Sequence, residues 1–543
     1  MGGALTEIES KDIIGGAMTE LSPYRTPGDA LARQAELRGD REALAFPETC
    51  ARLTYGEWHE AATALACALI DRGFRPGERI GLLAESRIEW PVVQMAVALA
   101  GCVLVPLNTH YRRDDLAYAL EHSRPRGLFL ARGFRGNPYL ETVRAIRQRL
   151  PALELAVVFD GPDGDRPGYG ELLAEGRGSS AALPEIDPDA TGSLQYTSGT
   201  TGFPKGALLT HAGMMANAWG ISGRLRVTDR DRWTSIIPLF HCAGCIMCIL
   251  GTVQRGAAYV GVSSFDAARM FRVIEDERCT MLSGVPTSYV AMLEHPARGG
   301  HDLATLRAGT CGGADTDPAL LARCAADFPI PGLVQVYGQT ESSTLIALAD
   351  CEAPERFATC GKPLPGARVR IADPAAGAPL PPGEIGQIET AGPMVMRGYF
   401  ENPAATAETV GADGWMRTGD LGYLTAEGDV VVAGGRLRDM IIRGGENIYP
   451  VEIENLLRAH PAVSDIAVFG LEDGYYGEIV AAAVTGGAEL TPDRLSRYCA
   501  GRIAGFKRPA RYFRVASFPL TASGKIRKTA LREMAEAGAL DPL

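Results

Sequence analysis

A regular alternation of short apolar segments with longer segments of helical periodicity is the feature that most constrains this fold. From Thr54 onward, apolar residues recur at i, i+4, i+7 and i+8, which predicts a helix that ends at Gly73. Apolar strands are predicted at 79–85 and 102–107, with a helix-length segment between them. Strand–helix–strand order is typical of a mainly parallel sheet with helices on its faces. The sequence therefore predicts an α/β domain.

The alternation continues along the chain and then changes character. Helix and strand signals alternate again over 266–348, whereas short strands and many Gly and Pro residues over 360–435 predict a β-rich subdomain. After a boundary near Arg438, a fresh set of helices and strands is long enough for a small domain. The predicted fold class is α/β, with a loose tail over 1–25, a large domain of parallel-rich α/β layers plus the β-rich subdomain over 26–437, and a small α+β domain over 438–543.

Length, charge and hydropathy exclude several classes of protein. A chain of 543 residues is too long for one compact core, so two or more domains are expected. The formal net charge of -11 and the lack of a long Lys/Arg run argue against nucleic-acid binding. The longest apolar stretch, 92–107, falls short of a membrane span, and the first residues hold no apolar block. Gly2 and Thr6 match the N-myristoylation pattern, which recurs by chance. We expect a cytoplasmic protein without stable membrane insertion.

The cysteines are scattered mostly singly through apolar segments and are interpreted as reduced, buried thiols. Cys242, Cys245 and Cys248 form a C-x-x-C-x-x-C run, for which two interpretations are open. The spacing suits an iron–sulfur site, but the expected fourth Cys followed by Pro is missing. Ala, Gly, Ile and Met fill the intervening positions, which favours a buried helix.

The segment from Tyr196 to Gly206 carries the strongest chemical signal in the chain. It combines glycines, threonine and serine hydroxyls, and Lys205 within a few positions. Glycine lets the backbone turn its N–H groups around an anion, the hydroxyls donate further hydrogen bonds, and the ammonium adds positive charge. Because Pro204 precedes the lysine and Gly206 follows it, the segment is not a P-loop. It predicts a phosphate-binding loop of another kind; the alternative is a flexible polar turn.

The same segment closely resembles the phosphate loop of the adenylate-forming superfamily, which includes acyl-CoA synthetases, aryl-CoA ligases, peptide-synthetase adenylation domains and beetle luciferases. Further motifs of this superfamily follow in its order, and the acyl-CoA synthetase branch is the most similar. The resemblance implies that 26–437 is an AMP-binding (adenylation) domain and that 438–543 is a mobile C-terminal domain. The further motifs are PLFHCAG at 238–244, YGQTE at 337–341, TGD at 418–420, GRLRDMIIRGGENIYPVEIE at 435–454 and PLTASGKIRK at 519–528.

The resemblance implies ATP-dependent activation of a carboxylic acid. The carboxylate attacks the α-phosphate of ATP, expels pyrophosphate and becomes an acyl-adenylate, whose leaving group is AMP. Charge accumulates on phosphoryl oxygens, so the site needs a metal ion and fixed cations. The implied catalytic residues are Lys525 at the α-phosphate, Glu341 as the Mg²⁺ ligand and His241 near the acyl carboxylate and the thiol. The alternative, non-functional interpretations of these three residues are, respectively, a surface Lys, a solvated loop carboxylate and a satisfied core His.

The resemblance also implies binding roles for four groups of residues. Arg438 takes the hinge position, where the superfamily usually has Asp or Lys. The nucleotide-binding group is Thr197, Ser198, Gly199, Thr200, Thr201, Gly202, Lys205, Gly313, Ala314, Tyr337, Gly338, Thr340, Asp420, Arg436 and Lys525. The coenzyme A group is Gly444, Gly445, Glu446, Phe506 and Arg508, and the acyl-pocket group is His241, Cys242, Ala243, Gly312 and Gly338.

The sequence narrows the class of acid without naming it. Residues 242–254 carry no charge, whereas amino-acid-activating relatives place an Asp near here to hold the α-ammonium. We therefore expect an apolar acid, aliphatic or bulky alicyclic or aromatic, used with ATP, Mg²⁺ and coenzyme A in fatty-acid or secondary metabolism, and a homodimer as the assembly to test. Three alternatives stay open: transfer of the acyl group to a carrier-protein thiol or a partner enzyme, a non-catalytic binding protein on this fold, and a luciferase-like oxygenase.

Overall fold

The computed structural model divides into two compact units, and each is described by itself. The large unit consists of Ile13–Val369 and Thr390–Met416, and the small unit consists of Met1–Asp12, Arg370–Glu389 and Arg417–Leu543. The residues that the structure describes are 14–15, 21–197, 204–313, 316–443, 446–500, 502–520 and 526–543, with the backbone alone for 434, 436, 438, 446 and 447. Most of the predicted tail over 1–25 thus lies outside the described residues.

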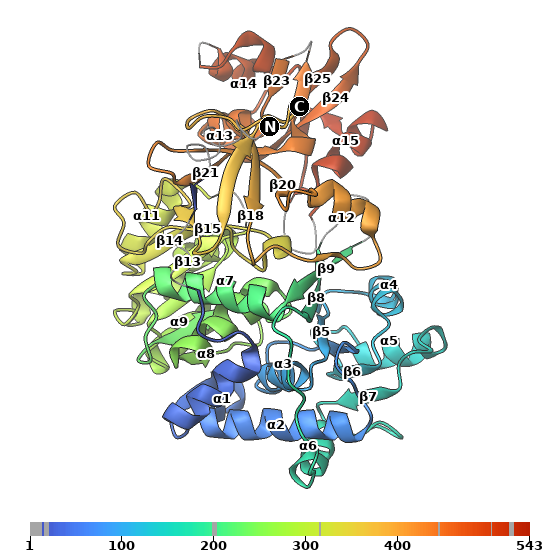
Figure 1. The fold of residues 1–543 in the computed structure, drawn as a ribbon. Coiled ribbons are helices and arrows are strands. Elements are labelled where there is room, and N and C mark those ends of the chain that lie inside the picture. The colour runs from blue at the N-terminus through green and yellow to red at the C-terminus, as the bar shows by residue number, and fades with distance from the viewer. Residues whose placement is uncertain are drawn as a thin grey trace, which may run out of the picture. The chain divides into compact units, whose positions relative to one another are not determined.

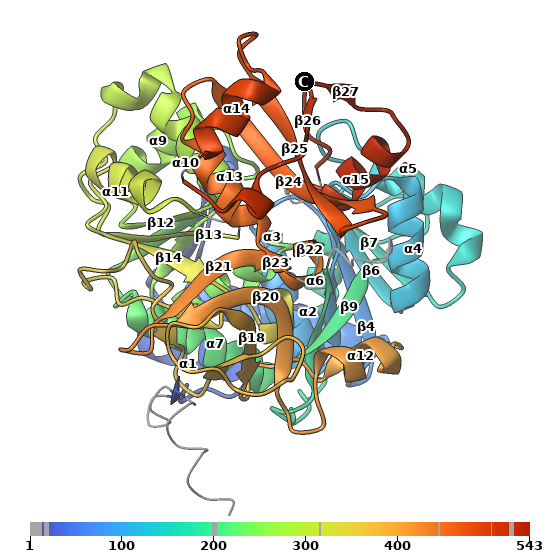
Figure 2. The same cartoon turned by 90° about the horizontal axis from the view of Figure 1, so that it is seen from above.

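A nine-stranded sheet forms one half of the large unit. Its strands from β14 to β2 pair in parallel, so that their carboxyl ends meet at one edge. The helices α9 (Ala267–Asp276), α10 (Pro286–Glu294) and α11 (Pro318–Asp327) lie side by side next to β12, β13 and β14 (Figures 1 and 2). The strand order is β16 (Lys362–Pro363), β15 (Ala347–Leu348), β14 (Gly332–Tyr337), β13 (Ala308–Gly312), β12 (Met281–Gly284), β10 (Arg232–Ser235), β11 (Ala258–Val260), β2 (Glu42–Phe46) and β3 (Ala51–Thr54).

A seven-stranded sheet forms the other half of the large unit. Its strands from β8 to β7 are parallel, and β8 turns back into β9 as an antiparallel hairpin. The helices α4 (Arg113–Ser123) and α5 (Tyr139–Ile146) lie beside β6 and β7 (Figure 2). The strand order is β19 (Gly398–Tyr399), β9 (Lys205–Thr210), β8 (Thr191–Thr197), β5 (Val103–Pro106), β4 (Arg79–Leu83), β6 (Gly127–Leu130) and β7 (Leu155–Val158).

One hydrophobic core is shared by strands of both sheets and by several helices of the large unit. The helix α2 (Tyr55–Asp71) confirms the helix predicted after Thr54. The Thr54 side chain caps this helix by accepting a hydrogen bond from the Glu57 N–H. Among the helices of the described ranges, none combines the length and hydropathy of a transmembrane span. The other helices of this unit are α1 (Pro27–Arg38), α3 (Glu89–Leu99), α6 (Tyr169–Arg177), α7 (His211–Arg224), the π-helix η4 (Ala243–Leu250), α8 (Gly251–Arg255) and α12 (Pro403–Thr409).

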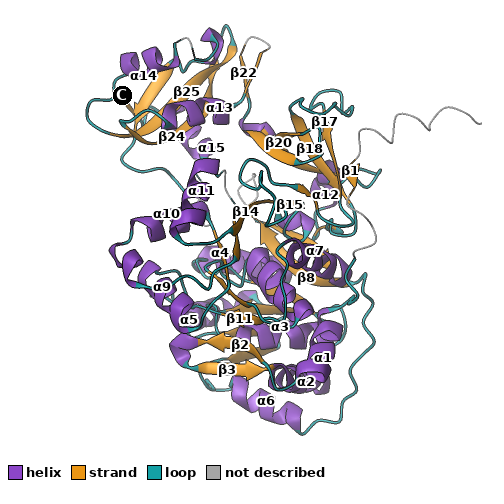
Figure 3. Ribbon diagram, turned by 90° about the vertical axis from the view of Figure 1, so that its left-hand side faces the viewer, coloured by secondary structure: helices purple, strands orange, loops and turns teal. Residues whose placement is uncertain are grey.

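The small unit contains much of the β-rich segment together with the set of elements after it. The segment contributes β17 (Arg368–Ala372), β18 (Gly386–Ala391), β20 (Met416–Leu424) and β21 (Val430–Arg436), which neighbour one another in that order. A further sheet is covered by α13 (Pro450–Arg458), α14 (Pro492–Cys499) and α15 (Lys528–Glu536) (Figure 3). Its strands are β22 (Ile441–Arg443), β23 (Glu446–Ile448), β24 (Val463–Asp473), β25 (Gly477–Gly486), β26 (Arg511–Arg514) and β27 (Asp541–Pro542).

A buried histidine gives the large unit a pH-dependent stability. His211 begins α7, is 1% exposed, and packs so tightly on Gly192 that a Cβ there would lie 2.6 Å from its Nδ1. Neither ring nitrogen has a hydrogen-bond partner among the described residues. Burial lowers the pKa of His211 to about 4, against the smaller opposite influence of Asp29 and Asp187. The ring is therefore neutral in the folded protein.

Because the folded pKa of His211 lies below the ordinary value of 6.5, the unfolded chain binds this proton first as the pH falls. The free energy of unfolding should therefore decrease between pH 6.5 and 4, by up to about 3 kcal/mol from this group. His211→Leu should show a shallower decrease. Urea unfolding of both proteins at several pH values in this window tests the expectation, which equal slopes would contradict.

Candidate active site

The β8–β9 hairpin positions the ends of the predicted phosphate loop. Thr197 at the end of β8 pairs in register with Lys205 at the start of β9. The Lys205 ammonium lies 5.1 Å from the centroid of the Tyr399 ring, within the range of a cation–π contact. Between Thr197 and Lys205, the residues that sequence analysis assigns to the nucleotide lie outside the described residues. These are Ser198, Gly199, Thr200, Thr201 and Gly202.

Two glycines at the carboxyl ends of β13 and β14 are required by the packing of the chain itself. A Cβ on Gly312 would lie 2.2 Å from the Val336 Cγ2, and one on Gly338 would lie 2.2 Å from the Thr344 carbonyl oxygen. The absence of a side chain at these positions therefore does not by itself leave room for an acyl tail. Gly313 differs, since it adopts φ +84° and a Cβ there would meet nothing nearer than Val285, at 3.8 Å. Ala314 lies outside the described residues.

Glu341 is a buried carboxylate in the short 3₁₀ helix η6 (Thr340–Ser342), which follows β14. The residue is 8% exposed, so the interpretation as a solvated loop carboxylate is wrong. Its Oε1 accepts a hydrogen bond from the Tyr399 hydroxyl at 2.8 Å, and its carbonyl oxygen accepts one from the Met396 N–H. Tyr399 comes from β19, and sequence analysis missed it. Tyr337, the last residue of β14, is also buried and pairs with Ala347.

His241 stands in the loop after β10, and its side chain is exposed, so the interpretation as a satisfied core histidine is wrong. The Ala243 N–H donates to its Nδ1 at 3.1 Å. An acceptor at Nδ1 carries no proton, so the neutral ring carries its proton on Nε2. Nε2 is therefore the atom through which His241 can donate a hydrogen bond to a bound group.

Cys242 joins the His241 loop to the segment that holds Glu341. Its Sγ lies 3.7 Å from the His241 Nδ1 and 3.6 Å from the Thr340 Oγ1. Burial by itself raises the pKa of the Cys242 thiol, but His241 and the hydroxyls of Thr340 and Thr344 outweigh this effect, so that the pKa lies below its ordinary value. Contacts thus connect Lys205, Tyr399, Glu341, Thr340, Cys242 and His241 in the large unit.

The three cysteines of the C-x-x-C-x-x-C run are free, buried thiols, which confirms the buried-helix interpretation. Cys245 and Cys248 lie in η4, a π-helix, and Cys242 directly precedes it. Burial raises the pKa of Cys248 to about 12, and the Cys245 Sγ accepts a hydrogen bond from the Gln195 Nε2 at 3.3 Å. The described residues contain no group of three or more His, Cys, Asp or Glu side chains that could hold a metal ion. π-Helical segments are frequent at functional sites.

In the small unit, two predicted nucleotide contacts are cross-strand neighbours. Asp420 on β20 lies directly opposite Arg436 on β21. The Asp420 side chain is 8% exposed, and its N–H donates to the Thr418 hydroxyl, so it is no ordinary turn residue. Backbone alone is described for Arg436, for Arg438 in η7 (Leu437–Asp439) and for Glu446 at the start of β23. The predicted residues Gly444, Gly445 and Lys525 lie outside the described ranges.

The predicted coenzyme A contacts Phe506 and Arg508 lie at the short helix η8 (Gly505–Lys507). The Phe506 side chain is exposed, and its carbonyl oxygen accepts a hydrogen bond from the Arg443 Nη1 at 2.7 Å. The Arg508 Nε is buried and has no hydrogen-bond partner within the described ranges. An unpaired guanidinium donor of this kind is suited to an anionic ligand.

Two regions of the chain match the models of one enzyme family. Residues 31–400 match the AMP-binding enzyme model, and residues 452–525 match the AMP-binding enzyme C-terminal domain model. Among curated relatives, the acyl-CoA ligase sidI of Aspergillus fumigatus is 35% identical over 539 residues, which cover 94% of this chain and 91% of the relative. The medium-chain acyl-CoA ligase ACSF2, mitochondrial, of Rattus norvegicus is 31% identical over 544 residues, which cover 94% of this chain and 88% of the relative.

A solved structure has the same fold along nearly the whole chain. The anthranilate CoA ligase AuaEII in complex with anthranoyl-AMP superposes with a TM-score of 0.83 at 26% identity, with 96% of this chain and 99% of that chain covered. The predicted α/β class and the predicted family are thereby confirmed. The chain belongs to the AMP-binding enzyme family and is an acyl-CoA synthetase of the adenylate-forming superfamily.

Proposed function

We propose that this acyl-CoA synthetase acts on an apolar monocarboxylic acid, aliphatic or bulky alicyclic or aromatic. In the first half-reaction, a carboxylate oxygen of the acid bonds to the α-phosphorus of ATP, and the bond from that phosphorus to pyrophosphate breaks. In the second, the sulfur of coenzyme A bonds to the acyl carbon, and AMP leaves with the oxygen that came from the acid. The products are acyl-CoA, AMP and pyrophosphate.

The choice of an apolar acid rests on one observation, the uncharged helix η4, which begins two residues after His241. Its side chains are almost entirely buried and include Ile246, Met247 and Leu250. The α-ammonium of an amino acid would need a carboxylate partner here, because an unpaired charge is costly in such surroundings. The medium-chain name of one relative agrees with this class of acid.

We assign Mg²⁺ binding to Glu341. An acceptor-only carboxylate oxygen is the ligand that this hard cation prefers, and the Tyr399 hydroxyl at 2.8 Å orients the carboxylate. Mg²⁺ held there would supply positive charge to the phosphate oxygens. His241 donates from Nε2 toward the acyl carboxylate, and Cys242 and Ala243 line the entrance for the acid.

The nucleotide contacts are assigned to both ends of the phosphate loop, Thr197 and Lys205, and to the ends of β13 and β14. Tyr337 stacks on adenine, and Lys525 neutralises charge at the α-phosphate during adenylation. Asp420 and Arg436 bind the ribose hydroxyls and a phosphate. Their direct opposition on β20 and β21 supports a shared role, since residues opposite each other in an antiparallel pair are close neighbours.

For the second half-reaction, the coenzyme A contacts are assigned to Phe506, Arg508 and the loop over 444–446. The buried Arg508 Nε, which has no hydrogen-bond partner among the described residues, supports this assignment, because a buried donor is costly until an acceptor satisfies it. A carrier-protein thiol or a partner enzyme is the alternative acceptor. The relatives named above are acyl-CoA ligases, which favours free coenzyme A.

A panel of carboxylic acids tests the proposed substrate class. Pyrophosphate release should be fastest with apolar monocarboxylic acids, and α-amino acids should have a kcat/KM lower by about a hundredfold or more, because their ammonium finds no partner. The same panel, run with coenzyme A and with a carrier protein under mass detection, identifies the thiol. An α-amino acid as the best substrate would contradict the apolar assignment, and a thioester formed with the carrier alone would contradict the assignment of coenzyme A.

A further inference from the structure

A groove of about 480 Å³ lies in the large unit, and none of the residues assigned to the reaction lines it. It is lined by Arg79, Val103 and Thr191, which are the first residues of the neighbouring parallel strands β4, β5 and β8. The Thr191 end of the groove is about 20 Å from Thr197, where the phosphate loop starts, along the extended strand β8, whereas the Phe400 end contacts Gly206 beside that loop. The volume lies in the range of small-molecule sites.

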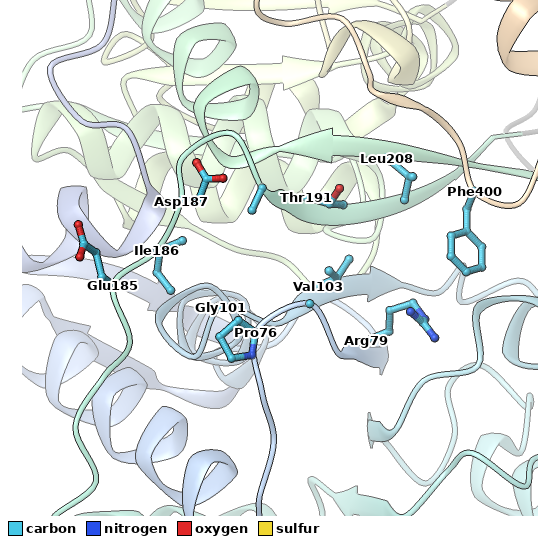
Figure 4. A pocket seen from close by; sticks show the side chains of 12 residues that line it. Pro76, Arg79, Gly101, Val103, Glu185, Ile186, Asp187, Thr191, Leu208 and Phe400 are labelled. Atoms are coloured by element: carbon cyan, nitrogen blue, oxygen red, sulfur yellow. The ribbon is translucent and has the colours of Figure 1, made fainter. Parts of the chain in front are cut away.

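The groove lies beside the starts of the neighbouring strands β5 and β8. These strands share the single register pair Leu104 with Ser193, whereas β5 and β4 pair along their whole length. The chain before β8 passes over the gap, and a Cβ on Gly101 would lie 3.0 Å from both the Ile186 Cδ1 and the Pro76 Cβ. Figure 4 shows the resulting walls, which are mostly apolar.

Arg79 places a positive charge at one end of the groove, and no carboxylate among the described residues forms an ion pair with it. The Arg79 guanidinium lies 5.2 Å from the Phe400 ring centroid, and its nitrogens donate to the carbonyl oxygens of Ser123 and Arg124. The two nearest carboxylates are engaged elsewhere, since Glu401 pairs with Arg124 and Glu78 pairs with Arg126. Burial, and then repulsion by Arg124, lowers the pKa of Arg79. An anion at this end would therefore be bound favourably.

The other end of the groove is acidic. Glu185 and Asp187 line it there, opposite to Arg79 and Phe400 in Figure 4. A ligand with one anionic group, an apolar body and no second negative charge matches this distribution. A dicarboxylate would place its second charge beside Glu185 and Asp187, which would repel it.

The groove is also connected to the Mg²⁺-binding carboxylate through two adjacent residues. Phe400 lines the groove, and its N–H donates to the Gly206 carbonyl oxygen at 2.8 Å. The preceding residue, Tyr399, donates to the Glu341 Oε1. Leu208 lines the groove from β9, whose first residue is Lys205. A ligand that displaces Phe400 therefore acts on the strand that orients Glu341.

We propose that this groove is a second ligand site, which binds an amphipathic monocarboxylate with its carboxylate at Arg79 and its apolar body along Val103, Leu208 and Phe400, and that its occupancy changes the affinity of the nucleotide site. The site is separate from the acid-binding site of the reaction, and it does not depend on which acid the enzyme activates. Binding and coupling are reciprocal, so the nucleotide also changes the affinity of the groove.

Equilibrium dialysis of radiolabelled octanoate against the full chain without ATP tests the binding. Arg79→Gln should weaken the groove site by about tenfold, as expected for loss of one charge-assisted contact. Leu208→Trp should abolish it by filling the groove, and Arg75→Gln, which removes an exposed charge outside the groove, should leave it unchanged. Octanedioate and octan-1-ol should compete poorly. Wild-type isotherms for Arg79→Gln and Leu208→Trp would overturn the proposal, and thermal unfolding shows whether each variant is folded.

The coupling is tested by the affinity for AMP with and without octanoate in the wild type and in Arg79→Gln. Octanoate in the acid-binding site of the reaction acts equally in both proteins, so the difference between them reports the groove. We expect octanoate to shift the AMP dissociation constant differently in the two proteins. Identical shifts would contradict coupling through Phe400 and Tyr399.

Discussion

Replacing Lys525 with alanine should slow acyl-adenylate formation by about two to three powers of ten, the usual scale for removing one fixed electrostatic contact to a developing charge. The assigned role of its ammonium is to follow negative charge as it moves from the carboxylate to the α-phosphate. Pyrophosphate release in a single turnover without coenzyme A measures this step. Transfer of a chemically prepared acyl-adenylate to coenzyme A should continue at nearly the wild-type rate.

Lys528→Ala is the matched control for this variant. It removes the same charge three residues further along the chain, where the ammonium pairs with Glu454 at 2.6 Å, and it should leave adenylation intact. Gly445→Leu should show the reverse defect, in which the adenylate forms and the thioester does not, because the side chain obstructs the thiol. Such a division is expected if the C-terminal domain alternates between two poses about Arg438. Equal losses in both half-reactions for Lys525→Ala and Gly445→Leu would contradict the two-pose mechanism.

Glu341→Gln should reduce adenylation by about a hundredfold, because it keeps the shape of the side chain and removes the negative charge assigned to Mg²⁺. The loss should come with a higher Mg²⁺ requirement, measured by pyrophosphate release across a Mg²⁺ titration. Tyr399→Phe should give an intermediate defect of about tenfold, since a hydrogen bond to a charged group is lost while the carboxylate remains.

The pair of variants separates orientation from charge at this site. Tyr399→Phe keeps the aromatic ring that lies 5.1 Å from the Lys205 ammonium, so its defect reports the hydroxyl. Higher Mg²⁺ should partly restore this variant and should restore Glu341→Gln much less. A wild-type rate and Mg²⁺ dependence for Glu341→Gln would refute the assignment of the metal ligand.

The elements of the large unit follow closely from the sequence, because each carries its own periodic signal. The helix predicted from Thr54 to Gly73 is α2, and the strands predicted at 79–85 and 102–107 are β4 and β5. Strand ends are harder to predict, as β24 and β25 show. The strand β24 continues through polar residues to Asp473, and β25 begins at Gly477, before its apolar residues. Both strands are longer than their apolar runs because cross-strand pairing continues beyond these runs.

The π-helix η4 marks a limit of sequence patterns. An almost wholly apolar segment indicates burial but not the number of residues per turn, so the sequence predicts a buried helix without its type. A sequence motif likewise indicates which chemistry is possible but not which distant residues contact it. The sequence identifies Glu341, whereas its contact with Tyr399 joins residues 58 positions apart and carries no local signal.

The glycines show why residue size alone is a weak guide to a pocket. Glycine is required at 312 and 338 because neighbouring atoms occupy the space of a Cβ, whereas at Gly313 a Cβ would only touch Val285 and the backbone has φ +84°. Sequence cannot distinguish these causes, since both select glycine. The roles of the residues outside the described ranges and the boundary near Arg438 stay predictions.

The most direct test of the central claim follows the oxygen atoms of the acid. A substrate acid whose carboxylate carries oxygen-18 at both positions is turned over with ATP and coenzyme A, and the AMP is analysed by mass spectrometry. Because the carboxylate attacks the α-phosphorus and the thiol then breaks the bond between the acyl carbon and that oxygen, each AMP should carry one labelled oxygen and each thioester the other. Unlabelled AMP, or ADP and labelled inorganic phosphate as products, would contradict acyl-adenylate chemistry.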